Sequence, residues 1–161
     1  MIKKYFLVVI FLFLCSCASV VQTIDLQKDK VYAVIPFENY TDTPLAGYTI
    51  ASTIEGSLRS QGLKVSERQW IFNDREPTKE EIDRIFKKAS QNADYIITGT
   101  VNEFRYKTGI DGEPTVSLSI FIYDTQKGVV VKGASGAWCG WAHESLGTVS
   151  QKLVREIFKL E

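Results

Sequence analysis

The chain is poor in the residues that metal sites and disulfide scaffolds require. It has one His and three Cys in 161 residues, too few for a structural zinc site or a disulfide framework. Neither sign of charge is in excess, with 19 Lys and Arg against 19 Asp and Glu. A neutral domain lacks the basic surface of a nucleic-acid binder. We therefore expect no bound metal and no nucleic-acid partner.

The residue patterns of common catalytic sites are also missing. No Gly-rich phosphate loop follows the first apolar run, where the sequence is ENYTDTPLAG. The single His143 has no nucleophile predicted beside it. Asp111 and Glu113 flank a turn, and two such acids form a glycosidase pair only if they face each other across a cleft. We predict no catalytic residue, no enzymatic activity and no cofactor.

The N-terminus has the pattern of an export signal. Lys3 and Lys4 precede an apolar run over residues 5–14, which is half the length that a membrane-spanning helix needs. The run ends in Leu-Cys-Ser-Cys at residues 14–17, which resembles a bacterial lipobox. We predict that residues 1–16 are a signal peptide and that Cys17 is the lipidated N-terminus. An uncleaved anchor, or a secretory signal cut elsewhere, remains the alternative.

Lipidation would place the protein on a membrane. Each buried CH₂ contributes about 0.8 kcal/mol, so several acyl chains on Cys17 would hold it firmly. Residue 18 is Ala rather than the Asp often found in lipoproteins of the inner membrane, which favours the outer membrane. Residues 17–30 are predicted to be the lipidated N-terminus and a flexible tether, which would reach roughly 20 Å. Removal of Lys3 and Lys4 leaves 17 basic against 19 acidic residues, a net charge of −2.

Cys139 is then the one thiol without an assigned role, because Cys15 leaves with the signal peptide and Cys17 carries lipid. We predict that it is buried and inert. Pairing between chains in an oxidising compartment is the alternative.

Residues 31–161 are predicted to form one periplasmic domain. The first half alternates strands and helices. A buried strand is expected over residues 31–37, a helix over 44–61 that starts with Thr43 as N-cap and Pro44 at its first position, and a short strand over 63–66. Thr78 and Glu81 form a capping box for a second helix that ends near Asn92. Residues 67–77 show no clear pattern.

The second half reads as three strands and a helix. The strands are expected over residues 95–106, 115–123 and 129–138, joined by turns as antiparallel hairpins, and the helix over 143–160. The order is β-α-β-α-β-β-β-α. This order predicts an α/β (α+β) fold, a single domain with a mixed sheet of about four to five strands and three helices packed on it.

Three stretches resemble a superfamily of bacterial periplasmic domains that includes the TolB N-terminal domain, CsgG and LpoB. They are VIPFENYTDTPLAGYTIASTIEGSLRSQGLKV, ADYIITGTVNEF and SIFIYDTQKGVVVKGASG. Within this superfamily, Thr-Pro-Leu-Ala-Gly at residues 43–47 and Gly140-Trp141, followed by Glu-Ser-Leu at 144–146, resemble the PelC family of outer-membrane lipoproteins of Pel exopolysaccharide export.

The resemblance implies a ring on the periplasmic face of the outer membrane. Such a ring would guide a cationic amino-sugar polysaccharide to an export β-barrel. Asp111 and Glu113 are the candidates for its acidic, polymer-facing surface, which would attract the polymer by diffuse electrostatics. Trp138 and Trp141 are the candidates for membrane-facing aromatic residues, because the Trp ring favours the membrane–water interface. Packing of one or both under the last helix is the alternative.

Two further expectations concern partners. A homo-oligomeric ring needs a head-to-tail contact, for which the candidates are Arg105, Tyr106 and Phe121. The alternative function is a lipoprotein activator of a peptidoglycan synthase, similar to LpoB. A tether as short as residues 18–30 suits a position close to the membrane better than it suits that function.

Overall fold

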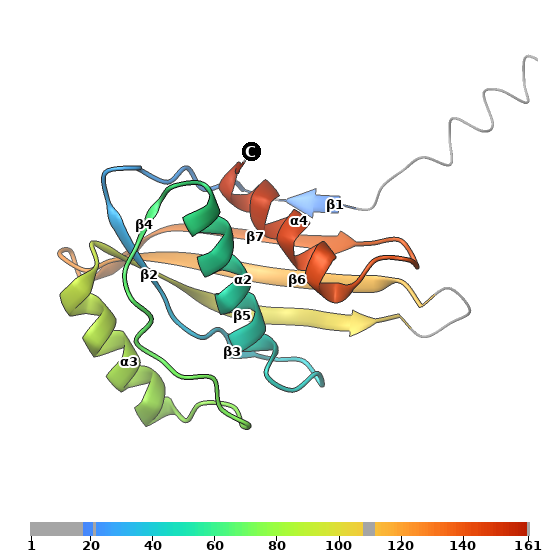
Figure 1. Ribbon diagram of the computed structural model, residues 1–161, viewed down its shortest axis with the longest axis horizontal. Helices are drawn as coiled ribbons and strands as arrows, with labels where there is room; N and C mark the ends of the chain where they lie inside the picture. Colours follow the sequence, from blue (N-terminus) through green and yellow to red (C-terminus); the bar gives the residue numbers. More distant parts are fainter. Residues whose placement is uncertain (1–17, 21, 108–111, 161) are drawn as a thin grey trace, which may run out of the picture.

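The computed structural model describes residues 18–20, 22–107 and 112–160 (Figure 1). The signal peptide, Cys17 and Asp111 lie outside the described residues. The elements follow one another as β1 (Ala18–Val20), β2 (Val31–Val34), β3 (Glu38–Asn39), α2 (Ala46–Ser60), β4 (Lys64–Val65), α3 (Lys79–Asn92), β5 (Tyr95–Tyr106), β6 (Pro114–Asp124), β7 (Val129–Cys139) and α4 (Leu146–Phe158).

Seven strands within the described chain form one mixed sheet. Its order is β1-β7-β6-β5-β2-β4, and the short β3 also pairs with β5. The neighbours β5, β6 and β7 are antiparallel, whereas β2 and β3 run parallel to β5. The predicted α/β class, mixed sheet and three helices are confirmed. The two strands beyond the predicted set, β1 and β3, are too short to show an alternating pattern in the sequence.

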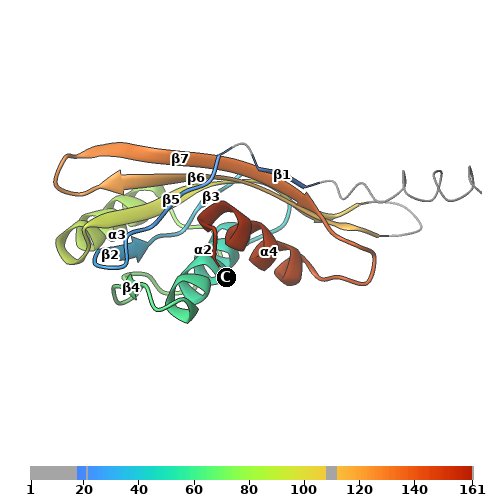
Figure 2. The same ribbon diagram turned by 90° about the horizontal axis from the view of Figure 1, so that it is seen from above.

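The helices cover the sheet unequally. Helices α2 and α4 lie together on one face, and α3 packs near β2 at one end of the molecule (Figures 1 and 2). The predicted apolar stripe of α2, formed by Ile50, Ile54 and Leu58, is fully buried in the larger hydrophobic cluster. Burial of such a side chain stabilises the fold by roughly 1.5–3 kcal/mol. A smaller cluster under α3 contains Ile35, Ala89 and Ile96.

The starts of α3 and α4 are set by local hydrogen bonds. The Thr78 hydroxyl accepts the Glu81 N–H at 3.3 Å, and the Glu81 carboxylate accepts the Thr78 N–H at 2.8 Å. This confirms the predicted capping box. Helix α4 starts three residues later than predicted, because the Ser145 hydroxyl accepts the Thr148 N–H at 3.1 Å and caps the helix there.

The predicted start of the first helix is wrong. The residue before α2 is Leu45, whose φ of 62° lies in the left-handed region, and it makes no side-chain capping hydrogen bond. Thr43 does not cap the helix, because its hydroxyl donates to the carbonyl of Phe104 on β5 at 2.5 Å. A contact with a distant strand has replaced the local cap that the Thr-Pro pair suggested.

The segment between β4 and α3 is irregular but anchored. Trp70 is buried, and its indole N–H donates to the Val34 carbonyl at 2.9 Å. The Arg68 guanidinium lies 4.2 Å from the Trp70 ring centroid and pairs with the Glu55 carboxylate at 2.7 Å. These contacts join the segment to β2 and α2. Contacts with distant residues therefore hold it in place, and it needs no helical or strand periodicity of its own.

Residues 18–20 and 22–30 do not form the free coil that we expected. Strand β1 pairs with β7 over three residues. Ile24 is 1% exposed, and its N–H donates to the Ile157 carbonyl of α4 at 2.7 Å. The expectation is wrong because Ile24 and Leu26 bury their side chains against the core. No helix among the described residues is long and apolar enough to cross a membrane.

Candidate functional site

Ala18, where the described part of the chain begins, lies at the same end of the molecule as the turn between β7 and α4. The antiparallel register of β1 and β7 places Ala18 opposite Trp138. Figure 1 shows the start of β1 at the end of the sheet where β7 leads into α4. Ala18 follows the predicted lipidation site directly in the sequence. A lipid on Cys17 would therefore join the domain at this end.

The two Trp residues of this end have different surroundings. Trp138 on β7 is half-buried and packs against the main core. Trp141 in the β7–α4 turn is 60% exposed. The sequence does not show which of the two is exposed, because they lie only three positions apart, one before and one after the end of the strand. The geometry makes Trp141 the residue that presents an aromatic ring to its surroundings.

Hydrogen bonds fix the turn that presents Trp141. Its backbone N–H donates to Glu144 Oε2 at 2.9 Å, and the Glu144 N–H donates back to the Trp141 carbonyl at 2.9 Å. The Glu144 carboxylate also pairs with Lys152 on α4. The hydrogen bond from Lys152, together with that from the Trp141 N–H, lowers the pKa of the Glu144 carboxyl. The carboxylate thus ties the turn to the helix.

Gly140 allows this turn to lie close to α4. A Cβ at this position would come within 2.4 Å of Val149 Cγ2 and 3.0 Å of Glu144 Oε2. A side chain here would force Val149 and Glu144 to shift, so glycine lets the strand end and the helix lie this close without that shift. The exposed ring of Trp141 therefore projects from a closely packed turn.

Glu113, one of the two predicted polymer-facing acids, has two partners. Its Oε2 atom lies 3.4 Å from Lys107 Nζ and accepts a hydrogen bond from the Cys139 thiol at 3.3 Å. The neighbouring Cys139 and Glu113 raise the pKa of the Lys107 amine. The negative charge of Glu113 is therefore partly balanced. Asp111, the other predicted acid, is not described.

Two residues that the sequence left without a function remain without one. Cys139 is partly buried, whereas we predicted a buried thiol, and its Sγ also lies 3.7 Å from the Thr115 hydroxyl. His143 is exposed. In the described ranges no three His, Cys, Asp or Glu side chains form a group that could hold a metal ion.

The predicted interface residues are partly engaged within the chain. Arg105 Nε donates to Glu103 Oε1 at 2.9 Å, and the Tyr106 hydroxyl accepts the Leu146 N–H at 3.3 Å. Phe121 is exposed on β6. Ile71, the most exposed of the large apolar side chains in the described part of the chain, was missed because it lies in the segment 67–77, where the sequence shows no clear pattern.

The fold is shared with a bacterial lipoprotein. Lipoprotein GNA1162 from Neisseria meningitidis superposes with a TM-score of 0.50 at 17% identity, over 79% of this chain and 96% of that chain. This likeness shows the fold alone and defines the class as an α/β domain with helices on a mixed sheet. A scan against protein-family models and a search of curated proteins give no match.

Two crystal forms of PelC from Paraburkholderia phytofirmans identify the family. A single-substitution variant, solved as a dodecamer, is 34% identical with a TM-score of 0.68, over 89% of this chain and 95% of that chain. Another PelC dodecamer is 32% identical with a TM-score of 0.66, over 87% and 94% of the two chains. The chain belongs to the PelC family.

Proposed function

We propose that this protein is a lipid-anchored ring component of a Pel-type exopolysaccharide export apparatus. It would sit on the periplasmic face of the outer membrane and lead a cationic polysaccharide to the export β-barrel. The observation that supports this most is the identity of 34% with a PelC dodecamer over nearly the full length of both chains.

The geometry of one end supports a fixed seating on the membrane. Ala18, which follows the predicted lipidated Cys17, is paired with β7 opposite Trp138, so little free chain would separate the lipid from the domain. Trp141 is exposed at this same end, and Trp rings favour the membrane–water interface. This close seating suits a ring on the membrane. It does not suit the long reach of a synthase activator.

We propose that the ring acts by guidance and not by catalysis. Asp111 and Glu113 remain our candidates for the acidic surface that meets the polymer. Because Lys107 lies beside Glu113 and partly balances its charge, Glu113 alone would attract the polymer only weakly. The attraction would come from the summed field of many copies around a ring. It would weaken as the salt concentration rises, because at 0.1 M salt charges are screened beyond about 10 Å.

Complementation tests this function. A bacterial strain that lacks its PelC would receive this gene, and secreted Pel polysaccharide would be measured. Restored secretion by the complete gene, with no secretion from a vector control, is the expected result. Polymer that is made at the normal level but never secreted would contradict the proposal, provided that the protein is found in the outer membrane.

A further inference from the structure

Two groups of exposed apolar side chains lie at opposite edges of the sheet. The first follows β4, the last strand at one edge, and the second lies on β6 and β7 near the other edge. Monomeric soluble proteins rarely expose contiguous apolar patches of large area, so such groups point to contacts with other molecules. Neither group belongs to the membrane-facing end described above.

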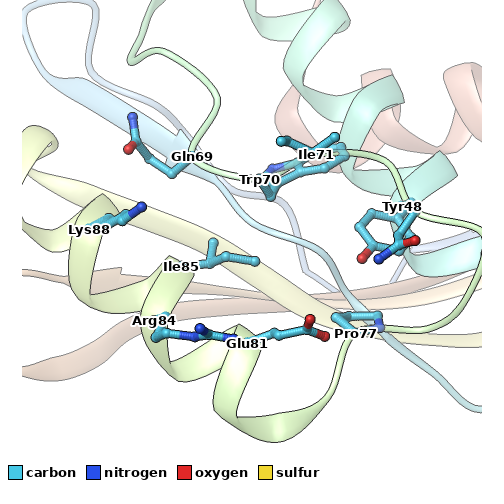
Figure 3. A pocket seen from close by; sticks show the side chains of 10 residues that line it. Tyr48, Gln69, Trp70, Ile71, Pro77, Glu81, Arg84, Ile85 and Lys88 are labelled. Carbon is cyan, nitrogen blue, oxygen red and sulfur yellow. The ribbon is translucent and has the colours of Figure 1, made fainter.

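The first group borders a groove, which we name the groove surface. The groove has a cavity volume of about 320 Å³, and it lies between the segment after β4 and helix α3 (Figure 3). Its lining includes Tyr48, Trp70, Ile71 and Ile85. Ile71 is 87% exposed and the neighbouring Phe72 is 57% exposed.

The groove surface is rigid enough to receive a partner. The Tyr48 ring lies 5.4 Å from both the Trp70 ring and the Phe72 ring, measured between centroids. The Trp70 hydrogen bond to Val34 fixes the groove floor to β2. Ile71 thus projects from a segment that is held in place on both sides, and its exposure does not come from a loose loop.

The second group is the edge surface, the open end of β6 and β7, where Phe121, Val129, Val130 and Val131 are all exposed. Side chains alternate along a strand, so Val130 lies on the same face of the sheet as Phe121, and Val129 lies on the other face. Within the described chain, β1 pairs with β7 only at residues 136–138, so the outer edge of β7 over residues 129–135 has no strand beside it. An apolar open edge is a template for association, and proteins often guard it with a charged Lys. Lys132 is turned aside here, since its amine donates to the Asp25 carbonyl at 2.8 Å.

We infer that the groove surface of one copy receives the edge surface of the next copy of this chain in the ring. A head-to-tail ring requires two different surfaces on each subunit, and each must stay free within the monomer. The groove and edge surfaces meet this requirement, because they lie on opposite edges of one sheet. The occupant is a second copy because the family members at 32–34% identity are dodecamers. The inference rests on the proposed ring and assigns its contact.

The placement agrees with a ring that stands on a membrane. Strand β7 rises about 3.3 Å per residue, so Val129 at its start lies about 30 Å from its end beside Trp141. Contacts through the groove and edge surfaces would therefore leave the membrane-facing end free in every copy. Apolar burial at each contact would contribute the driving force.

Cysteine pairs in the complete lipoprotein test this contact. In a Cys139→Ser background, Ile71→Cys and Val130→Cys would be introduced together, and isolated outer membranes would be treated with a short bismaleimide. We expect a ladder of covalent oligomers from the double variant and monomers from each single variant. Coexpression of the two single variants should give dimers and no larger species, because each chain then has one thiol.

The control keeps one cysteine and moves the other. Val130→Cys would be combined with Gln151→Cys on the exposed face of α4, and no ladder is expected. Ile71 and Val130 are both exposed, so we expect the variants to fold. Thermal melting would check this.

The outcomes separate the two proposals. If the protein without substitutions has the mass of an oligomer but the Ile71–Val130 pair gives no ladder, the contact is wrong and the ring stands. Dimers from Ile71→Cys alone would overturn the head-to-tail contact, because they require the groove surface to meet itself. A mass of one chain under all conditions would overturn both the ring and the contact.

Discussion

Glu144 and Trp141 exchange hydrogen bonds across the turn between β7 and α4. The Trp141 N–H donates to the Glu144 carboxylate and the Glu144 N–H donates to the Trp141 carbonyl, each at 2.9 Å. The backbone that carries the exposed indole is therefore fixed relative to the sheet end that Ala18 joins. This relation connects a local hydrogen-bonded turn to the proposed seating of the domain on a membrane.

Replacement of the two Trp residues should separate membrane seating from stability. Trp141→Ala is expected to leave the free energy of unfolding within about 0.5 kcal/mol, because the ring is exposed. Trp138→Ala is expected to cost about 2–3 kcal/mol, somewhat less than a fully buried Trp. Urea unfolding measures both. Flotation of the lipidated protein with liposomes should weaken for Trp141→Ala only, and equal flotation of all forms would remove Trp141 from the membrane.

The lipid anchor has a direct test. Cys17→Ser removes the predicted acylation site and should move the protein from the outer-membrane fraction to the soluble periplasmic fraction. Cys139→Ser, which keeps the anchor, is the matched control. Retention of the Cys17→Ser protein in the outer membrane would show that another segment holds it there.

The capping box of α3 predicts a pH dependence of stability. Hydrogen bonds from Arg75 and from the Thr78 N–H lower the pKa of Glu81 to about 2. Its ordinary value is about 4.3, so the folded state favours the charged form. The stabilisation is then complete above pH 4.3 and is lost as the pH falls toward 2.

Thermal melting of Glu81→Gln checks this dependence. Its melting temperature should be lower than that of the protein without substitutions at pH 6, and the gap should close between pH 4.3 and 2. Arg75→Gln removes one partner of Glu81 and keeps the cap, so it should give a smaller gap. A gap that stays constant down to pH 2 would contradict the assignment to the Glu81 carboxylate.

Trp70 should stabilise the groove surface through its N–H as well as its ring. Trp70→Phe keeps an aromatic side chain but leaves the Val34 carbonyl without this donor, at an expected cost of about 1–3 kcal/mol. Guanidinium unfolding measures the cost. Phe72→Leu, a change at an exposed neighbour, should cost much less, and an equal cost for both would show that the hydrogen bond contributes little.

The acidic turn is tested by polymer export. Asp111→Asn together with Glu113→Gln should reduce secretion without lowering the melting temperature, whereas Glu113→Gln alone should have a small effect because Lys107 already balances that charge. Lower salt in the medium should strengthen the difference. Export that does not change in the double variant would remove this turn from the path of the polymer.

Local signals in the sequence predicted the elements best. Thr78 and Glu81 are three residues apart, so their capping box was visible in the sequence, and β5 has the predicted bounds because its residues are sheet formers bounded by turns. The start of α2 was predicted wrongly because Thr43 bonds to Phe104, 61 residues away. Residues that are far apart in the sequence show no regular spacing, so the sequence alone does not predict a contact between them.

The candidate site was predicted in part for the same reason. The sequence placed two Trp residues near the end of β7, but only the packing of Trp138 against the main core distinguishes it from exposed Trp141. It gave no indication that residues 18–20 pair with β7. Ile71 was also hidden, since its exposure depends on the anchoring of Trp70 beside it.

The mass of the lipidated protein in mild detergent shows whether the chain assembles into a ring. Light scattering corrected for bound detergent would be measured over a range of protein and salt concentrations. We expect one closed oligomer of fixed mass, a dodecamer if the chain assembles as its PelC relatives do. A mass of one chain at every concentration would contradict this expectation.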